Sequence, residues 1–326
     1  MFTDTFGRSH SYLRISVTER CDLRCRYCMP ANGVPLTPRD EILTFEEIRR
    51  LAGIFAAGGV NKVRLTGGEP LVRRELPALV DMLSRIQGIE QLSMTTNGML
   101  FDRHVEALND AGLTAVNISL DTLREDRFEE ITRRKGLAKA LNAIDLALQF
   151  GFNPVKINAV VLRGVNDDEL GDFARLTLTR PVHVRFIEYM PFQGNGWNDN
   201  RFLPYSDMLQ ILENDGLDLT REVDEANDTT KHYRVNGGLG TVGFISSMSE
   251  HFCSSCNRVR LTADGNLKVC LFGNAEVSLR DMMRAGASDD DITEAIQSAV
   301  SRKKASHNGM YNIANEENRP MILIGG

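Results

Sequence analysis

The six cysteines of this chain fall into two separate groups of three, and none lies outside them. The groups are Cys21-x3-Cys25-x2-Cys28 near the N-terminus and Cys253-x2-Cys256-x13-Cys270 near the C-terminus. Three soft thiolate ligands at such spacing are typical of iron–sulfur clusters and of zinc. A four-iron cluster bound by three cysteines keeps one iron open to a non-protein ligand, as catalytic metal sites keep an open position. The two groups therefore predict chemistry at two metal centres.

Disulfides and structural zinc are the competing explanations for these cysteines. Six cysteines in 326 residues are sparse for a disulfide scaffold, and the first residues, Met-Phe-Thr-Asp-Thr-Phe-Gly-Arg, contain no apolar signal segment. Zinc is the stronger rival at the second group, because His251 lies two residues before Cys253 and could supply a fourth ligand. As a single residue, His251 is more typical of an ordinary loop histidine.

Composition predicts a globular, cytoplasmic enzyme. The chain is 42% apolar and 25% charged, with no apolar run long enough to span a membrane, and its net charge of −6 argues against a nucleic-acid partner. Positive side chains nevertheless recur beside the motifs, which favours a small anionic substrate. They are Arg14, Arg24, Arg26, Arg64, Arg73, Arg74, Lys156, Arg258 and Arg260. Two further basic runs, Arg133-Arg134-Lys135 and Arg302-Lys303-Lys304, are interpreted as solvated surface.

Short β-rich runs alternate along the chain with longer amphipathic stretches. The predicted strands are Tyr12–Val17, Lys62–Thr66, Gln91–Thr95, Ala115–Leu120, Val155–Val161 and His183–Tyr189. Between the first two, Thr44 and Glu47 form a capping-box pattern, and the helix it starts stops at Gly58. Asp102–Ala111 and Gly136–Phe150 predict further helices. This alternation is typical of right-handed βαβ units around a parallel sheet, either an incomplete (β/α)6 relative of the TIM barrel or a flatter doubly wound sheet.

Polar or glycine-rich residues follow each predicted strand, where barrel enzymes build their sites. The first strand leads into the first cysteine loop, the second into Gly67-Gly68-Glu69-Pro70, and the fourth into Ser119-Leu120-Asp121. Gly67 and Gly68 would let a ligand approach the backbone closely, although a tight turn would explain them equally well. The succession of such strand ends favours a barrel with its site at the carboxyl ends of the strands.

These motifs resemble those of a known family. Cys21-Asp-Leu-Arg-Cys25-Arg-Tyr-Cys28 is similar to the CxxxCxxC signature of radical S-adenosylmethionine (SAM) enzymes, and Gly67-Gly68-Glu69-Pro70 resembles their GGEP segment. The second group, with its Asn257-Arg258-Val259-Arg260 run, and the final Gly325-Gly326 resemble the GTP 3',8-cyclases, the molybdenum cofactor biosynthesis protein A family. The resemblance covers essentially the whole chain.

The resemblance implies a radical SAM partial barrel, residues 1–204, followed by a C-terminal cluster-binding domain, residues 205–326. It also implies two 4Fe-4S clusters and S-adenosyl-L-methionine as cofactors. The first cluster would cleave SAM to a radical that abstracts the 3' hydrogen of GTP, giving (8S)-3',8-cyclo-7,8-dihydroguanosine 5'-triphosphate, the first step of molybdopterin biosynthesis. The second cluster would anchor the guanine base. A different two-cluster radical SAM enzyme that modifies a peptide is the alternative, and a non-catalytic iron–sulfur or zinc protein is disfavoured because it leaves the GGEP segment without a role.

The resemblance also implies a set of site residues. SAM would contact Tyr27, Gly68, Ser119 and Met190. GTP would contact Arg14, Arg64, Thr95, Lys156, Arg258, Val259 and Arg260. The cluster ligands would be Cys21, Cys25, Cys28, Cys253, Cys256 and Cys270, and Arg258, Arg260, Gly325 and Gly326 would be needed for the chemistry. Packing roles for Tyr27 and Met190, and an Arg64–Glu69 salt bridge, stay open as alternatives.

The expected partners are GTP, an electron donor of the flavodoxin or ferredoxin type, and a cyclic pyranopterin monophosphate synthase that accepts the product. No nucleic acid or membrane is expected, and the chain would be a monomer or a homodimer. The four apolar residues Met321–Ile324 would dock the tail against the protein, and the two side-chain-free residues after them could reach into the barrel beside the substrate.

Overall fold

The fold was described from a computed structural model, which describes residues 1–325. Its centre is a set of parallel strands that lie side by side in the order in which they occur in the chain. They are β1 (Tyr12–Ser16), β2 (Lys62–Thr66), β3 (Gln91–Thr96), β4 (Ala115–Ser119), β5 (Val155–Val161) and β6 (Val182–Glu188). All six predicted strands are confirmed to within one residue at each end. Sequential order without a reversal is that of a barrel and not of a doubly wound sheet.

Strands from the last third of the chain extend this sheet at both edges. β9 (Thr241–Ile245) pairs in parallel with β6, and β10 (Arg258–Leu261) pairs in parallel with β1. Antiparallel strands then complete a sheet of 12 strands. These are β7 (Leu219–Arg221) and β8 (Lys231–Val235) beyond β9, and β11 (Asn266–Lys268) and β12 (Glu276–Ser278) beyond β10. Because one sheet contains both parts of the chain, the division at residue 205 stays a prediction.

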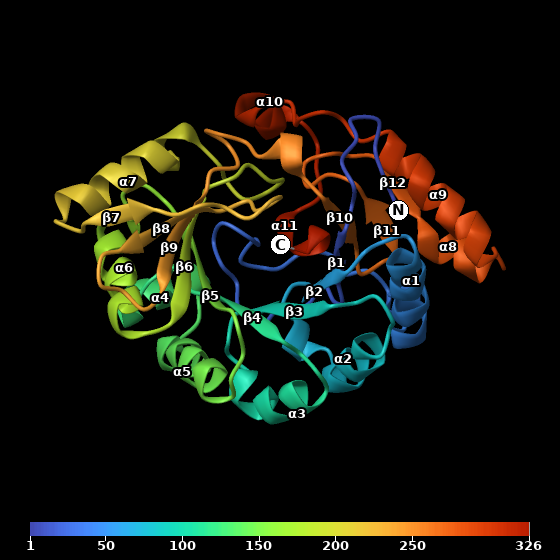
Figure 1. Ribbon diagram of the computed structural model, residues 1–326, viewed down its shortest axis with the longest axis horizontal. Helices are drawn as coiled ribbons and strands as arrows, with labels where there is room; N and C mark the ends of the chain where they lie inside the picture. Colours follow the sequence, from blue (N-terminus) through green and yellow to red (C-terminus); the bar gives the residue numbers. More distant parts are fainter. Residues whose placement is uncertain (326) are drawn as a thin grey trace.

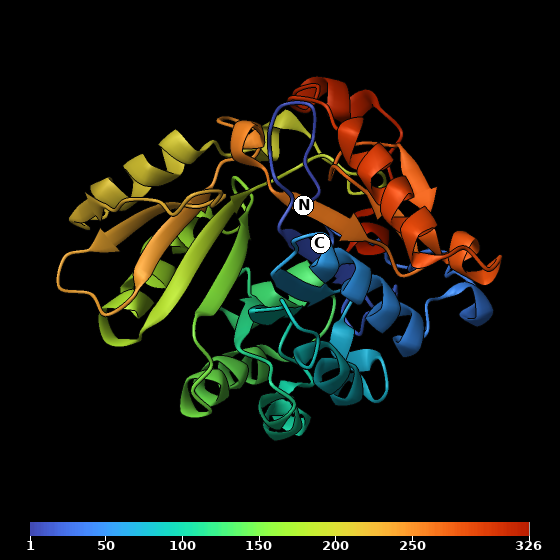
Figure 2. The same ribbon diagram turned by 45° about the vertical axis from the view of Figure 1, so that its right-hand side comes forward.

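Helices cover the outer side of the curved sheet, while the short helix α11 lies within its arc (Figures 1 and 2). The helices are α1 (Phe45–Ala57), α2 (Leu76–Ser84), α3 (Val105–Asp110), α4 (Glu125–Thr132), α5 (Leu137–Gln149), α6 (Leu170–Thr179), α7 (Tyr205–Asn214), α8 (Leu279–Arg284), α9 (Asp289–Ser301), α10 (Met310–Asn315) and α11 (Met321–Ile324). The capping box of Thr44 and Glu47 is confirmed at the start of α1. Among residues 1–325, no helix is long and apolar enough to cross a membrane.

The hydrophobic residues form two separate cores. The larger core lies between the sheet and the outer helices and contains Leu13, Ile15, Phe55 and Phe186. The smaller core contains Phe192, Met248, Phe272, Ile313 and Ile324, with Met190, Cys270 and Met321 packed against it. The smaller core therefore joins the end of the chain to the segment that carries the second cysteine group.

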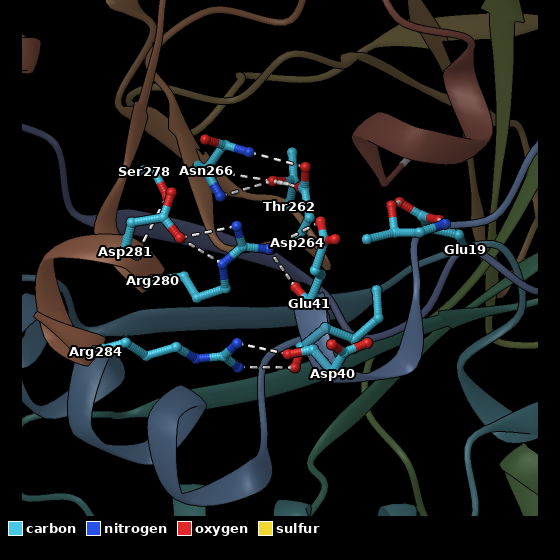
Figure 3. A network of polar contacts seen from close by, with 12 residues as sticks. Glu19, Asp40, Glu41, Thr262, Asp264, Asn266, Ser278, Arg280, Asp281 and Arg284 are labelled. Carbon is cyan, nitrogen blue, oxygen red and sulfur yellow. Dashed lines mark hydrogen bonds and ion pairs between the residues drawn. The ribbon is translucent and has the colours of Figure 1, made fainter.

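A polar network ties the segment after the first cysteine loop to the C-terminal region (Figure 3). Arg280 donates to the backbone oxygen of Glu41 (2.6 Å), and Arg284 donates to that of Asp40 (2.5 Å). At the other end of this segment, Glu19 accepts hydrogen bonds from the backbone and hydroxyl of Thr37 (2.7 and 2.8 Å). The part of this segment that leads into α1, from Thr37 to Glu41, is thus held both by Glu19 and by α8.

Glu188 at the end of β6 organises a second junction with the C-terminal region. Its buried carboxylate accepts backbone hydrogen bonds from Met248 (2.7 Å), Ser249 (3.0 Å) and Tyr205 (2.9 Å), and one from the Ser249 hydroxyl. A buried N–H group without an acceptor costs free energy, so this single side chain satisfies three backbone donors that no strand pairs.

We therefore predict that Glu188→Ala lowers the free energy of unfolding by about 3 kcal/mol, because the buried donors lose their acceptor. Glu188→Gln keeps one acceptor oxygen and should cost about 1 kcal/mol. The matched control is Glu250→Ala, since Glu250 has an exposed side chain paired only with Lys231, and it should change stability by less than about 0.5 kcal/mol. Urea unfolding of the three variants measures this, and equal losses for Glu188→Ala and Glu250→Ala would contradict it.

Candidate active site

All six cysteines line one cavity of about 390 Å³ inside the arc of the sheet. Its wall also includes residues along the length of β1 to β6, residues of β10, and residues of the tail. The volume lies in the range typical of small-molecule and cofactor sites. The structure therefore brings together two cysteine groups that are more than 200 residues apart in the sequence.

The first cysteine loop follows β1 and is held by backbone contacts from α4. The backbone N–H groups of Arg24 and Arg26 donate to the carbonyls of Thr132 and Ile131 (both 2.9 Å), and Arg133 donates to the Arg24 carbonyl (2.6 Å). Arg133 was expected on the solvated surface, and that expectation is wrong, because its guanidinium is needed to satisfy this loop. Burial raises the pKa of Cys21 and of Cys28 to about 12, and it also raises the pKa of Cys25 well above its usual range.

The glycines of the GGEP segment are required by the cysteine loop itself. A Cβ on Gly67 would lie 2.6 Å from the Thr18 carbonyl oxygen, and one on Gly68 would lie 2.3 Å from that of Arg20. Glu69, which is buried, accepts from the backbones of Leu71 and Asn97 and from the Thr96 hydroxyl. Arg64 instead donates to the Ser93 hydroxyl (3.2 Å), and within residues 1–325 it forms no ion pair with Glu69, so the alternative of an Arg64–Glu69 salt bridge is wrong. Burial raises the pKa of Glu69 to about 7, against the effect of these hydrogen bonds.

The four residues predicted to contact SAM all line the cavity: Tyr27, Gly68, Ser119 and Met190. Tyr27 donates to Asp121 (2.8 Å), whose other oxygen accepts from the backbone of Val160 (2.9 Å). Burial raises the pKa of Asp121 to about 6. Tyr27 thus has a defined polar role, whereas Met190 also packs against the smaller core.

The register of the parallel strands gathers the predicted anion-binding residues. Arg260 of β10 is opposite Arg14 of β1, which is opposite Arg64 of β2, so three arginines from three neighbouring strands share one row. Burial and the charge of Arg260 hold the pKa of Arg14 well below its usual range, and burial also lowers that of Arg260. Like charges on directly opposite residues destabilise a sheet. Such a row is therefore suited to a multiply charged anion.

The positively charged wall of the cavity, here called the cationic wall, also contains residues that sequence reasoning did not single out. They are Tyr12, Lys62 and Arg185. In the row next to the arginines, Tyr12 lies between Arg258 and Lys62, and both cations lie over its ring, 5.5 and 5.1 Å from the centroid. Arg185 of β6 donates twice to Asn158 (2.9 and 2.6 Å). The alternation of side chains along β6 could have indicated which residues of that strand share a face with Arg185. The register of β6 against β5 then places Arg185 beside Asn158.

Several buried polar atoms in the wall have no hydrogen-bond partner within residues 1–325. They are the Tyr12 hydroxyl, the Thr95 hydroxyl, Nη1 of Arg258 and Nε of Arg260. A buried hydrogen-bonding group without a partner lowers the stability of the protein. These groups therefore point to a polar ligand that binds in the cavity and pairs with them. Predicted substrate contacts supply three of these four atoms.

Val259 is placed differently from the other predicted substrate residues. Its side chain is 1% exposed and belongs to the larger core, while its neighbours Arg258 and Arg260 line the cavity. Alternation along β10 explains this, because successive side chains of a strand point to opposite faces. Any contact of Val259 with a ligand therefore has to come from its backbone.

The second cysteine group is surrounded by positive charge. Burial opposes ionisation of Cys256, but the Lys303 ammonium, the Arg258 backbone N–H and two arginine charges lower its pKa to about 7. Lys303 was expected on the solvated surface with Arg302 and Lys304, and that expectation is wrong, because Lys303 is only 5% exposed. His251 is exposed and lies edge-to-face with His307, with ring centroids 5.1 Å apart.

The last described residues run along the cavity wall and end at Gly325 beside β1 and β2, and the role of Gly325 in the chemistry stays a prediction. Met321 and Ile322 line the cavity, and Ile322 and Ile324 are buried. Gly325 has φ of +80°, and a Cβ there would lie 2.6 Å from the Thr66 hydroxyl and 2.8 Å from Cβ of Ser16. Only glycine fits at this position beside the ends of β1 and β2. Gly326 lies outside the described residues.

The donor set fits iron–sulfur clusters by its chemistry. All six thiols are free, each is partly buried, and both groups open onto the same cavity. Among residues 1–325, no three or more His, Cys, Asp or Glu side chains are already arranged as ligands of a single metal ion, and this finding does not distinguish zinc from a cluster at either cysteine group. The fit therefore rests on soft ligands at two separate walls.

The sheet order and the cysteine loop after β1 define a radical SAM protein, and comparison with known proteins agrees. Residues 15–177 match the model of the Radical SAM superfamily, and residues 182–309 match that described as Molybdenum Cofactor Synthesis C. The fold is similar to that of SuiB from Streptococcus suis, with a TM-score of 0.62 and 16% identity over 98% of this chain and 77% of that one.

Sequence relatives define the family. The GTP 3',8-cyclase of Moorella thermoacetica is 46% identical over 99% of both chains, and the mitochondrial GTP 3',8-cyclase of Arabidopsis thaliana is 52% identical over 100% of this chain and 84% of its own. The chain belongs to the GTP 3',8-cyclase family. It spans about half the length of other relatives, such as molybdenum cofactor biosynthesis protein 1 of Dictyostelium discoideum, which is 54% identical over 100% of this chain and 52% of its own.

The cationic wall leads to a pH-dependent prediction for Lys156. Burial, with the charges of Arg185 and Arg64, lowers the pKa of Lys156 to about 7. Below that pH the free protein already carries the charge, whereas above it an incoming anion has to draw a proton onto the amine. We predict that affinity for tripolyphosphate falls as pH rises from 7 to 9 and that binding at pH 8 takes up protons.

Titration calorimetry in two buffers of different ionisation enthalpy measures this proton uptake. Lys156→Met should abolish most of it, while Lys139→Met, which changes an exposed lysine of α5, should not. The comparison removes the ligand's own ionisation, which is the same in all three proteins. Equal uptake by Lys156→Met and the unchanged protein would contradict the prediction.

Proposed function

We propose that this chain is a radical SAM GTP 3',8-cyclase, which converts GTP to (8S)-3',8-cyclo-7,8-dihydroguanosine 5'-triphosphate in the first step of molybdenum cofactor biosynthesis. The observation that carries the proposal is a single cavity that both cysteine groups and the cationic rows of β10, β1 and β2 share. A nucleoside triphosphate requires both a strongly positive wall and a separate position for its base. Family membership supports the same reading.

Cys21, Cys25 and Cys28 would hold one 4Fe-4S cluster, and Cys253, Cys256 and Cys270 would hold the other. When bound, the first cluster and SAM supply the one-electron chemistry that removes hydrogen from the substrate sugar. Tyr27, Gly68, Ser119 and Met190 would border SAM, with Asp121 fixing the hydroxyl of Tyr27.

The remaining residues would bind and orient GTP. Arg14, Arg64, Lys156 and Arg260 supply charge for the triphosphate, because guanidinium forks and an ammonium suit phosphate oxygens. Arg258 and the second cysteine group would lie at the base, and Thr95 offers an unpaired hydroxyl. The buried tail around Ile324 and Gly325 would keep solvent from the reacting atoms, as radical chemistry requires.

The proposal extends to partners that chemistry demands. An electron donor of the flavodoxin or ferredoxin type would reduce the first cluster, and a cyclic pyranopterin monophosphate synthase would take the product. A monomer or homodimer in the cytoplasm is part of the same proposal.

Anaerobic incubation with GTP, SAM and dithionite, followed by identification of the product by mass spectrometry and NMR, tests the function. The expected product has the mass of GTP and a new bond between the sugar C3' and guanine C8. Iron analysis should give about eight iron atoms per chain. A peptide-modifying enzyme would leave GTP unchanged, and the density of positive charge in the cavity argues against that alternative.

The two cysteine groups should respond differently to the loss of one ligand. Cys25→Ser replaces a soft thiolate by a weakly acidic hydroxyl, so SAM cleavage should fall at least about 100-fold while iron at the second group is retained. Cys256→Ser should impair GTP binding and cyclisation more than it impairs uncoupled SAM cleavage. Deoxyadenosine formation, GTP affinity and iron content are the three measurements, and normal deoxyadenosine formation by Cys25→Ser would overturn the assignment of the first group.

The tail should be needed for turnover but not for folding. Removal of Gly325 and Gly326, or Gly325→Ala, which forces a Cβ against Thr66 and Ser16, should leave both clusters and GTP binding largely intact and lower cyclisation at least about tenfold. Gly286→Ala is the matched control, because Gly286 also has positive φ but faces open space. A short peptide ending in Gly-Gly should partly restore the truncated protein, and full turnover without the tail would show that it is dispensable.

A further inference from the structure

Lys303 follows α9 and turns its side chain inward to the second cysteine group. Its ammonium lies 3.3 Å from Sγ of Cys256, 2.9 Å from the backbone oxygen of Arg258 and 2.9 Å from Nε2 of His10. Three N–H donors thus meet three acceptors, and the side chain is almost completely buried. A buried lysine is expensive, so its retention among fully matched acceptors marks a specific role.

His10 acts here as an acceptor. Burial, with the nearby charge of Lys303, lowers the pKa of His10 to about 4, so the imidazole is neutral at ordinary pH. Since Nε2 faces the ammonium, the imidazole proton resides on Nδ1. The positive charge of the pair therefore belongs to Lys303, next to the sulfur.

The N-terminal segment fixes this lysine in place. Arg8 donates to the backbone oxygens of Lys304 (2.8 Å), Ala305 (2.9 Å) and Cys253 (2.6 Å), and it pairs with Asp4. One guanidinium therefore joins the loop that carries Lys303 to the loop that carries the cysteines. The distance from the ammonium to Cys256 is set by the protein and not by solvent.

The two cysteine groups lie in opposite electrostatic surroundings. In the first group, Oδ1 of Asp22 lies 3.9 Å from Sγ of Cys21, whereas in the second group the Lys303 ammonium lies 3.3 Å from Sγ of Cys256. One-electron reduction makes a cluster more negative, so a fixed cation and a hydrogen bond to a ligand sulfur stabilise the reduced form more than the oxidised form.

We infer that Lys303 is a positioning residue that, through its hydrogen bond to Cys256, raises the reduction potential of the second cluster. The inference rests on the proposed function in one respect, namely that the second group holds an iron–sulfur cluster. A cluster that is easier to reduce keeps its electron away from SAM, so the two clusters take separate roles although they share a cavity.

A redox titration of the second cluster alone tests this. In a Cys25→Ser background, dithionite supplies one electron per cluster, and electron paramagnetic resonance follows the reduced form against potential. At a fixed potential, Lys303→Met should lower the ratio of reduced to oxidised cluster at least about tenfold. For a one-electron couple, this corresponds to a fall of about 59 mV in the reduction potential. Lys303→Arg keeps charge and donors and should retain most of the potential, and exposed Lys304→Met should leave it unchanged.

Each outcome decides the inference. An unchanged potential in Lys303→Met with iron present overturns it, as does an equal shift in Lys304→Met. Loss of iron in Lys303→Met but not in Lys303→Arg supports a charge requirement at the sulfur, and loss of iron in both overturns it in favour of a purely steric role. Absence of iron from the second group with Lys303 intact would overturn the two-cluster assignment, and the inference with it.

Discussion

The pairing of β10 with β1 is the contact on which the site depends. It joins a strand that begins at Arg258 to one that begins at Tyr12, and it does so in parallel register, so that Arg260 lies opposite Arg14. Since Cys256 lies two residues before Arg258, the same pairing places Cys256 near the amino end of β1, while the first cysteine loop follows the carboxyl end of that strand. Without this contact, β1 would be an edge strand of the sheet.

This register has an electrostatic cost that a ligand can offset. Buried arginines from three neighbouring strands repel one another, and burial lowers the pKa of Arg14, Arg185 and Arg260. Within residues 1–325, Asp228 is one counter-charge in this region. It pairs with His232 (2.9 Å), and Lys156 also acts on it. Repulsion between these cations lowers the stability of the free protein. A triphosphate would supply several more negative charges and offset that repulsion when bound.

The sequence allowed the parallel barrel and most of the cavity wall to be predicted, because both follow from local patterns. The strand pattern placed Ser119 at the end of β4, and the resemblance to a known family pointed to Arg64 and Lys156, which lie within β2 and β5. Pairing partners were harder: no local signal says that β10 returns to β1 or that β9 lies beside β6. Lys303 was misread for the same reason, because a basic run at the end of an amphipathic helix normally lies in water, and only the long-range contact with His10 and Cys256 shows otherwise.

The last residues of the chain cover part of the cavity through two features: a hydrophobic contact at Ile324 and the absence of a side chain at Gly325. The anchor is hydrophobic, since Ile324 packs with Phe192, Met248 and Phe272, and Arg319 adds a charged contact to Asp264 (3.0 Å). Beyond the anchor, Gly325 passes within van der Waals distance of the sheet beside Thr66, where a side chain has no room. A residue with a Cβ would hold the tail off the strand ends and reopen the cavity to water. A site that excludes water protects a reactive intermediate from side reactions, so the narrow last segment suits the radical chemistry that we propose for this cavity.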